Sequence, residues 1–137
     1  MGDYDQLGKK LIRMAVGALF ADSGDSVKIN FGPGGGSAQI DGTVAGEVAV
    51  EIESRVPKQI RGAILDLILH PYRKKLLLLI PMHTGNPETI VQQANAILGR
   101  FLDANTFRVL MITDSPEQTI QNIRIALVEL GVASAAG

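Results

Sequence analysis

The chain has 137 residues, a formal net charge of −1, 46% hydrophobic residues and 20% charged residues. These values are typical of one globular domain, which we expect to span residues 1–137. Because the chain has no cysteine, disulfides, thiolate metal sites and cysteine nucleophiles are excluded. The near-neutral charge excludes a global basic field, so any binding of nucleic acid would need a local basic patch.

The apolar runs are too short for a membrane protein. The opening "MGDYDQLGKK" lacks the apolar core of a signal peptide. The longest apolar run, "LLLLIP", is far shorter than the roughly 20 residues that span a bilayer. We therefore expect a soluble cytoplasmic protein without a membrane partner.

The first half of the sequence predicts a helix followed by three strands. Apolar residues at helical spacing mark a helix over 3–20. A glycine-rich segment over 32–37 then separates two predicted strands, 26–31 and 38–44. A hairpin turn at Ala45 and Gly46 leads into a third strand over 47–54. In this third strand Val48, Val50 and Ile52 point to one face, while Glu47, Ala49, Glu51, Glu53 and Arg55 point to the other.

The second half alternates helices and strands. Helices are predicted over 57–70 and 87–103, and the last helix begins after the cap residue Ser115 and ends at Gly131. The segments 74–82 and 107–113 are apolar throughout, as in strands that are covered on both faces. Residues 132–137 are expected to be a flexible tail. The element order predicts an α/β fold with a mixed central sheet and helices on both faces.

Several polar features have simple structural interpretations. The glycine-rich segment has no Walker lysine, and Ser37 stands where a dinucleotide fingerprint needs glycine, so it is predicted to be a flexible connector. His70 and His83 have no partner at metal-ligand spacing and are interpreted as structural. No nucleophile elbow supports a catalytic triad.

The carboxylates around the third strand are harder to explain. Glu47 is interpreted as a solvated residue of an edge strand. Asp41, in contrast, lies among small and apolar residues, and Glu51 and Glu53 share one face of the strand. Their charges would repel one another unless a cation lay between them. We therefore favour a magnesium site over simple solvation, because Mg²⁺ takes one or two carboxylates together with waters and phosphate oxygens.

This pattern resembles the PD-(D/E)xK nucleases, a superfamily that includes type II restriction endonucleases and Holliday-junction resolvases. Their core is a helix, three antiparallel strands, a helix and a fourth strand, similar to the order predicted for residues 5–83. Asp41 resembles the motif aspartate and Glu51 the first residue of the Glu-x-Lys pair, while Glu53 stands in the lysine position. The sequence departs from the family at Ile40, where proline is frequent, and in the first helix, where Asp5 could replace the usual glutamate.

The resemblance implies a magnesium-dependent DNA endonuclease, with manganese as a possible substitute. Asp41, Glu51 and the backbone carbonyl of Ile52 would bind the metal, and Glu53 would orient or deprotonate the attacking water. An alternative frame takes Glu53 and Arg55 as the motif pair and leaves Glu51 auxiliary.

Basic residues near the end of the third strand are the predicted contacts to DNA: Arg55, Lys58, Gln59 and Arg61. Arg73, Lys74 and Lys75 form a second basic cluster, and solvated helix ends would equally explain both groups. A homodimer is expected, because so short a chain leaves little room for a recognition domain. The competing hypothesis is a non-catalytic DNA-associated or assembly protein on a degenerate nuclease fold.

Overall fold

A computed structural model of the chain describes residues 3–54, 57–81 and 86–136. Arg55 and His83 therefore lie outside the described residues. The helices are α1 (Asp3–Val16), α2 (Pro57–Leu69), α3 (Pro87–Phe101) and α4 (Pro116–Glu129). The strands are β1 (Phe20–Ala21), β2 (Lys28–Asn30), β3 (Ser37–Gln39), β4 (Gly42–Val44), β5 (Val48–Glu53), β6 (Lys74–Leu79) and β7 (Phe107–Met111). Of the short 3-10 helices, η1 covers Gly17–Leu19, η2 Asp25–Val27, η3 Ala104–Thr106 and η4 Ala133–Ala136.

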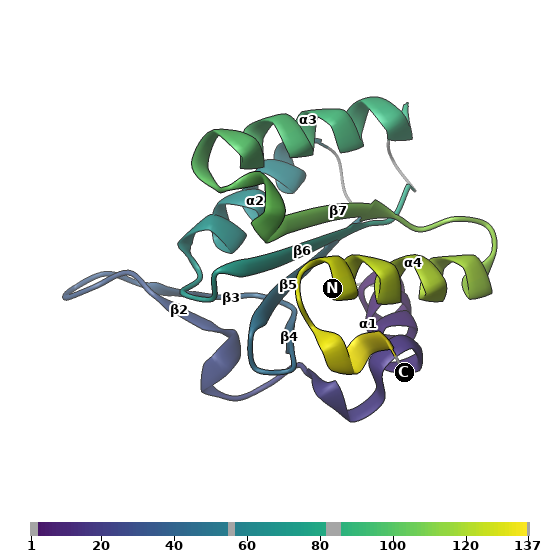
Figure 1. Cartoon of the computed structure of the whole chain (residues 1–137). Helices are drawn as coiled ribbons and strands as arrows, with labels where there is room; N and C mark the ends of the chain where they lie inside the picture. The colour runs from purple at the N-terminus through teal and green to yellow at the C-terminus, as the bar shows by residue number, and fades with distance from the viewer. Residues whose placement is uncertain (1–2, 55–56, 82–85, 137) are drawn as a thin grey trace.

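The central sheet has the strand order β1-β4-β5-β6-β7. The β1-β4 and β4-β5 pairs are antiparallel, whereas the β5-β6 and β6-β7 pairs are parallel. Helices α1 and α4 cover one face of this sheet, and α2 and α3 cover the other (Figure 1). The predicted mixed α/β fold with helices on both faces is confirmed.

The strand β5 lies in the middle of the sheet, and all six of its residues are buried. Val48, Val50 and Ile52 pack into the core on the α1–α4 side, while Ala49 packs into the core on the α2–α3 side. This is the alternation that the sequence predicts, and it turns Glu51 toward the α2–α3 side. Because the strand is covered on both faces, its acidic side chains are held inside the molecule.

The two apolar strands of the second half differ in burial. Strand β6 is buried along almost its whole length, as predicted. The prediction that 107–113 is also buried on both faces is wrong, since β7 is an edge strand and only Phe107 is fully buried. Helices α3 and α4 pack on its two faces, but one edge pairs with no other strand of the described chain.

The predicted strand over 38–44 is divided into β3 and β4, which belong to different sheets. Strands β2 and β3 form a separate two-stranded ribbon, and the loop between them projects away from the main sheet (Figure 1). The chain crosses between the sheets at Ile40 and Asp41. The Ile40 N–H donates to Val27 O at 2.9 Å, whereas the next N–H, of Asp41, donates to Val50 O at 3.1 Å. Asp41 therefore stands at the junction, one residue before β4.

The last helix begins as its sequence predicts, because the Ser115 hydroxyl accepts the N–H of Gln118 at 3.1 Å. Gly131 follows the helix with φ 93°, a conformation that favours glycine. Where a flexible tail is expected, residues Ala133–Ala136 form η4, with Val132 and Ala135 buried in the core. No helix of the described chain is long and apolar enough to span a membrane.

The junction allows a first prediction, because a side chain at Gly42 would not fit. A Cβ there would lie 2.8 Å from the carbonyl oxygen of Ala21 and would also overlap the Phe20 ring. We expect Gly42→Ala to lower the free energy of unfolding by roughly 1–3 kcal/mol, as overpacking does. Gly62→Ala is the matched control: it meets no atom within 4 Å in α2 and should raise stability by roughly 0.5–1 kcal/mol. Urea unfolding of both variants measures the difference, and equal effects would contradict the packing described here.

Candidate functional site

Asp41 and Glu51 lie opposite each other beside the β4–β5 pair, and each carboxyl group accepts a main-chain N–H from the other segment. The Asp41 N–H donates to Glu51 Oε1 at 2.8 Å, and the Ile52 N–H donates to Asp41 Oδ2 at 2.7 Å. Both carboxyl groups are thus fixed by main-chain donors at the point where the chain enters the central sheet. The predicted meeting of Asp41 with Glu51 is confirmed.

Burial makes this pair unusually difficult to ionise. Glu51 is only 7% exposed. Burial, followed by the charge of Asp41 and a hydrogen bond shared with it, raises the pKa of Glu51 to about 10. The pKa of Asp41 is also raised by burial, although the Ile52 N–H partly offsets that effect. Without a bound cation, the pair therefore holds a proton at neutral pH.

A third carboxyl group, Asp66 of α2, joins the pair and was not predicted from the sequence. It shares a hydrogen bond with Glu51, and its pKa is raised by burial and by the charge of Asp41. The available signal was its position in "AILDLIL", where a single acidic residue interrupts an apolar stretch of helix. Helix α1 contributes opposing charges, because Asp5 raises the pKa of Asp41 and Lys9 lowers it. Asp5 is thus close enough to act on the site electrostatically.

Glu53 lies two residues beyond Glu51 on the same face of β5. It is only 4% exposed, and its Oε2 accepts the N–H of Ser54 at 3.0 Å. The strand β5 therefore carries a second buried carboxyl group at its carboxyl end, but the predicted clustering of Glu53 with Asp41 and Glu51 is not shown by any contact of the described residues.

The oxygen atoms around the junction suit a hard cation such as Mg²⁺. Each of the two carboxyl groups uses one oxygen for a main-chain N–H. In a β-strand the N–H and C=O of one residue point to the same side, so the Ile52 carbonyl points toward the side on which its N–H meets Asp41. The described residues contain no group of three or more acidic, histidine or cysteine side chains arranged to hold a metal ion. Two carboxylates suffice for Mg²⁺, which completes its coordination with waters and phosphate oxygens.

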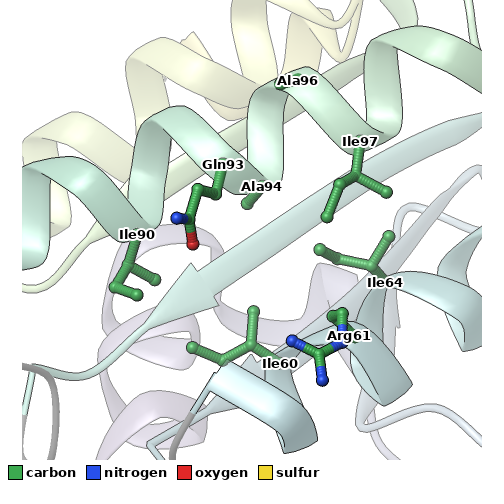
Figure 2. A pocket seen from close by; sticks show the side chains of 8 residues that line it. All are labelled: Ile60, Arg61, Ile64, Ile90, Gln93, Ala94, Ala96 and Ile97. Carbon is green, nitrogen blue, oxygen red and sulfur yellow. The ribbon is translucent and has the colours of Figure 1, made fainter.

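The residues predicted to contact DNA are dispersed. Lys58 is exposed in the first turn of α2, and the next residue, Gln59, is half-buried. The Gln59 Oε1 is buried without a hydrogen-bond partner among the described residues. Arg61 instead lines an apolar groove of about 320 Å³ between α2 and α3, where Figure 2 shows it on the same side as Ile60 and Ile64 and across from Gln93. The groove is therefore separate from the carboxyl groups.

The second predicted basic cluster, Arg73, Lys74 and Lys75, is also divided. Lys74 and Lys75 are adjacent residues of β6, so their side chains point to opposite faces of the sheet. Lys74 forms an ion pair with half-exposed Glu47. The prediction that Glu47 is a solvated residue of an edge strand is therefore wrong, because it is paired and precedes the central strand β5. Lys75 is buried and donates to the carbonyl oxygen of His70 at 2.6 Å. His70 has its Nε2 2.6 Å from Ser26 O, and its Nδ1 accepts the Tyr72 N–H, which supports the structural interpretation of this histidine.

Comparisons with protein-family models, with curated proteins and with solved structures found no match. The function of the chain is therefore inferred from the geometry of the site.

The protonated state of the pair predicts how stability changes with pH. Because the folded pKa of Glu51 is above its unfolded value, the native state binds more protons than the unfolded state between about pH 4.5 and 10. Stability should therefore fall as pH rises through this range, and Glu51→Gln should remove much of that fall. In urea unfolding with EDTA at pH 8, we expect the variant to be more stable by roughly 1–3 kcal/mol.

Glu47→Gln is the matched control, since it changes a half-exposed carboxylate next to the same strand. Its effect should stay within about 1 kcal/mol. The contrary result is a Glu51→Gln protein that is less stable than the wild type at pH 8, with a stability that depends on pH as the wild type's does. That result would contradict the conclusion that the Asp41–Glu51 pair holds a proton at neutral pH.

Proposed function

We propose that the chain is a magnesium-dependent endonuclease that hydrolyses phosphodiester bonds in DNA, in the manner of the PD-(D/E)xK nucleases. The observation that carries this proposal is the pairing of half-buried Asp41 with buried Glu51, whose carboxyl groups accept the main-chain N–H groups of Ile52 and Asp41, respectively. A fold does not need such a pair, because burying carboxyl groups together opposes folding at neutral pH. A divalent cation would replace the shared proton and remove that cost.

The order of elements supports the same proposal. Strands β1, β4 and β5 are antiparallel neighbours, and α2 then leads to β6, which is parallel to β5. With α1 before them, these elements give an order similar to that of the nuclease core, although its first strand would be β1 and not the predicted strand 26–31, which belongs to the β2–β3 ribbon. The ribbon of β2 and β3 would then be an insertion between the first and second core strands.

In this proposal each site residue has a defined task. Asp41, Glu51 and the Ile52 carbonyl would hold the metal ion. A bound Mg²⁺ supplies charge neutralisation at the phosphodiester and lowers the pKa of a coordinated water. Glu53 would orient the attacking water and accept its proton. The buried, hydrogen-bonded setting keeps these oxygens in place before the substrate arrives.

The amino end of α2 is the proposed contact to the DNA backbone. Exposed Lys58 and the amino end of the helix dipole favour a phosphate there. Arg55 and Arg61 remain proposed contacts that flank this turn. Two copies of the chain would serve the two strands of a duplex, and we place this activity in the cytoplasm.

The direct test is cleavage of plasmid, branched and single-stranded DNA with Mg²⁺ or Mn²⁺. We expect Asp41→Asn to lower the cleavage rate by about 100-fold or more, because it removes a charged metal ligand while keeping the side-chain shape. Asp114→Asn, which changes an exposed aspartate, is the control and should cut at the wild-type rate. If the wild-type protein cuts none of these substrates with either metal, the non-catalytic hypothesis replaces this proposal.

The Glu53 position allows a separate prediction about the attacking water. Glu53→Gln should slow cleavage by about 10-fold or more, since general-base catalysis contributes roughly 10²–10⁴-fold. Glu53→Lys restores the commoner family arrangement and should cut faster than Glu53→Gln. The two rates are compared at saturating Mg²⁺, and a lysine variant that is the slower of the two would contradict this role.

A further inference from the structure

A second pocket, of about 300 Å³, lies where α2 ends and β6 begins. The α2–β6 and α3–β7 connections come together at this end of the molecule (Figure 1). Lys75 is aligned with Ala49 of β5, so it lies two residues nearer the amino end of the sheet than Glu51. Among the described residues, the lining includes Arg73 and Lys75 of the second basic cluster but none of the predicted catalytic residues and none of the DNA contacts predicted in α2.

Lys75 lines this pocket and is the only buried lysine among the described residues. It is 2% exposed, and its Nζ donates one hydrogen bond, to His70 O at 2.6 Å. No carboxylate of the described chain forms an ion pair with it. A protonated lysine has three N–H donors, so two remain for a ligand.

The other polar groups around the pocket leave its charge positive. Arg73 lines the pocket and is paired loosely with Asp103, at 3.7 Å between two well-exposed side chains. His70 cannot supply charge, because its Nδ1 accepts the Tyr72 N–H and its Nε2 lies 2.6 Å from Ser26 O. Two cations and one carboxylate therefore face the pocket.

Keeping an ammonium group at this depth opposes folding. Burial lowers the pKa of Lys75 to about 8, yet the amine still carries its charge at neutral pH. An apolar side chain of similar size would be more stable at such a position. A bound anion would supply the missing countercharge and two acceptors.

We propose that this pocket binds the phosphate group of a small phosphate ester, with Lys75 as the buried cation and Arg73 as a second cation at the rim. The apolar side chains of Ile68, Phe101 and Leu102 form a wall for the rest of the molecule. The volume is at the lower end of the range for ligand pockets, which fits a sugar phosphate better than a dinucleotide. This site is independent of the proposed nuclease activity.

A simpler role for Lys75 would be to cap the last turn of α2 through the His70 carbonyl alone. That role predicts no dependence of anion binding on Lys75 or on the rim charges. The two accounts therefore differ in a measurable way.

The test is a titration of the full-length protein with ribose 5-phosphate, inorganic phosphate and a short DNA duplex, followed by amide NMR shifts. We expect saturable shifts at Tyr72, Arg73 and Thr106 with ribose 5-phosphate below about 10 mM. Lys75→Met should weaken this binding about tenfold or more, and Arg73→Gln about two- to fivefold. Asp103→Asn should strengthen it, because it removes the negative charge at the rim.

Lys74→Met is the matched control, since Lys74 is the adjacent residue of the same strand and pairs with Glu47 instead. It should leave the affinity for ribose 5-phosphate unchanged. Sulfate, whose own charge does not change over this range, is the anion for a titration against pH. Its binding should weaken as the pH rises above about 8, because Lys75 loses its proton there. The other charged or titratable side chains that line the pocket are Arg73, Asp103, Tyr72 and the neutral His70.

The proposal is overturned if ribose 5-phosphate causes no saturable shifts, or if only the duplex does. Equal affinities for Lys75→Met and Lys74→Met would also overturn it. If Lys75→Met does not fold, the opposite effects of Arg73→Gln and Asp103→Asn decide the question, and the absence of both effects contradicts the proposal.

Discussion

The exchange of hydrogen bonds between Asp41 and the segment Glu51–Ile52 is the interaction on which the site depends. It occurs where the chain leaves the β2–β3 ribbon and enters the central sheet. The Asp41 side chain therefore lies at the end of this crossing and also contacts the middle strand, β5. Because β5 is covered by helices on both faces, Glu51 is buried, and Asp41, which is half-buried, pairs with it. Position in the fold therefore determines their chemistry.

Buried carboxyl groups without a cation are stable only when they share protons. Glu51 shares hydrogen bonds with Asp41 and Asp66, so the carboxyl groups that share protons come from β5, from the residue before β4 and from α2. A cation at this point would exchange with the proton, and metal binding would therefore become stronger as pH rises.

Much of the fold could be predicted from the sequence because it depends on local patterns. Apolar spacing indicates the helices, Ala45 and Gly46 turn the β4–β5 hairpin, and Ser115 begins the last helix. The division of the strand at Ile40 could not be predicted, since alternation continues through it and only contacts with Val27 and Val50 draw the two halves apart. The edge position of β7 depends on strand order, which a run of apolar residues does not encode.

The site residues, too, could be predicted from the sequence only where they depend on local strand pairing. Asp41 and Glu51 could be paired from strand register alone, but Asp66 reaches them only through the packing of α2 on β5. Lys75 appeared to belong to one basic cluster with Lys74, although adjacent residues of a strand point to opposite faces. That difference places one lysine on a half-exposed ion pair and the other in the lining of a pocket.

The most direct test of the central claim is anomalous diffraction from crystals grown with Mn²⁺ at pH 8. We predict a single strong peak within about 2.0–2.3 Å of carboxylate oxygens of Asp41 and Glu51, the distance range of oxygen ligands to such cations. Crystals without a peak there, in which the two carboxyl groups still share a proton, would contradict the proposal that this pair is a metal site.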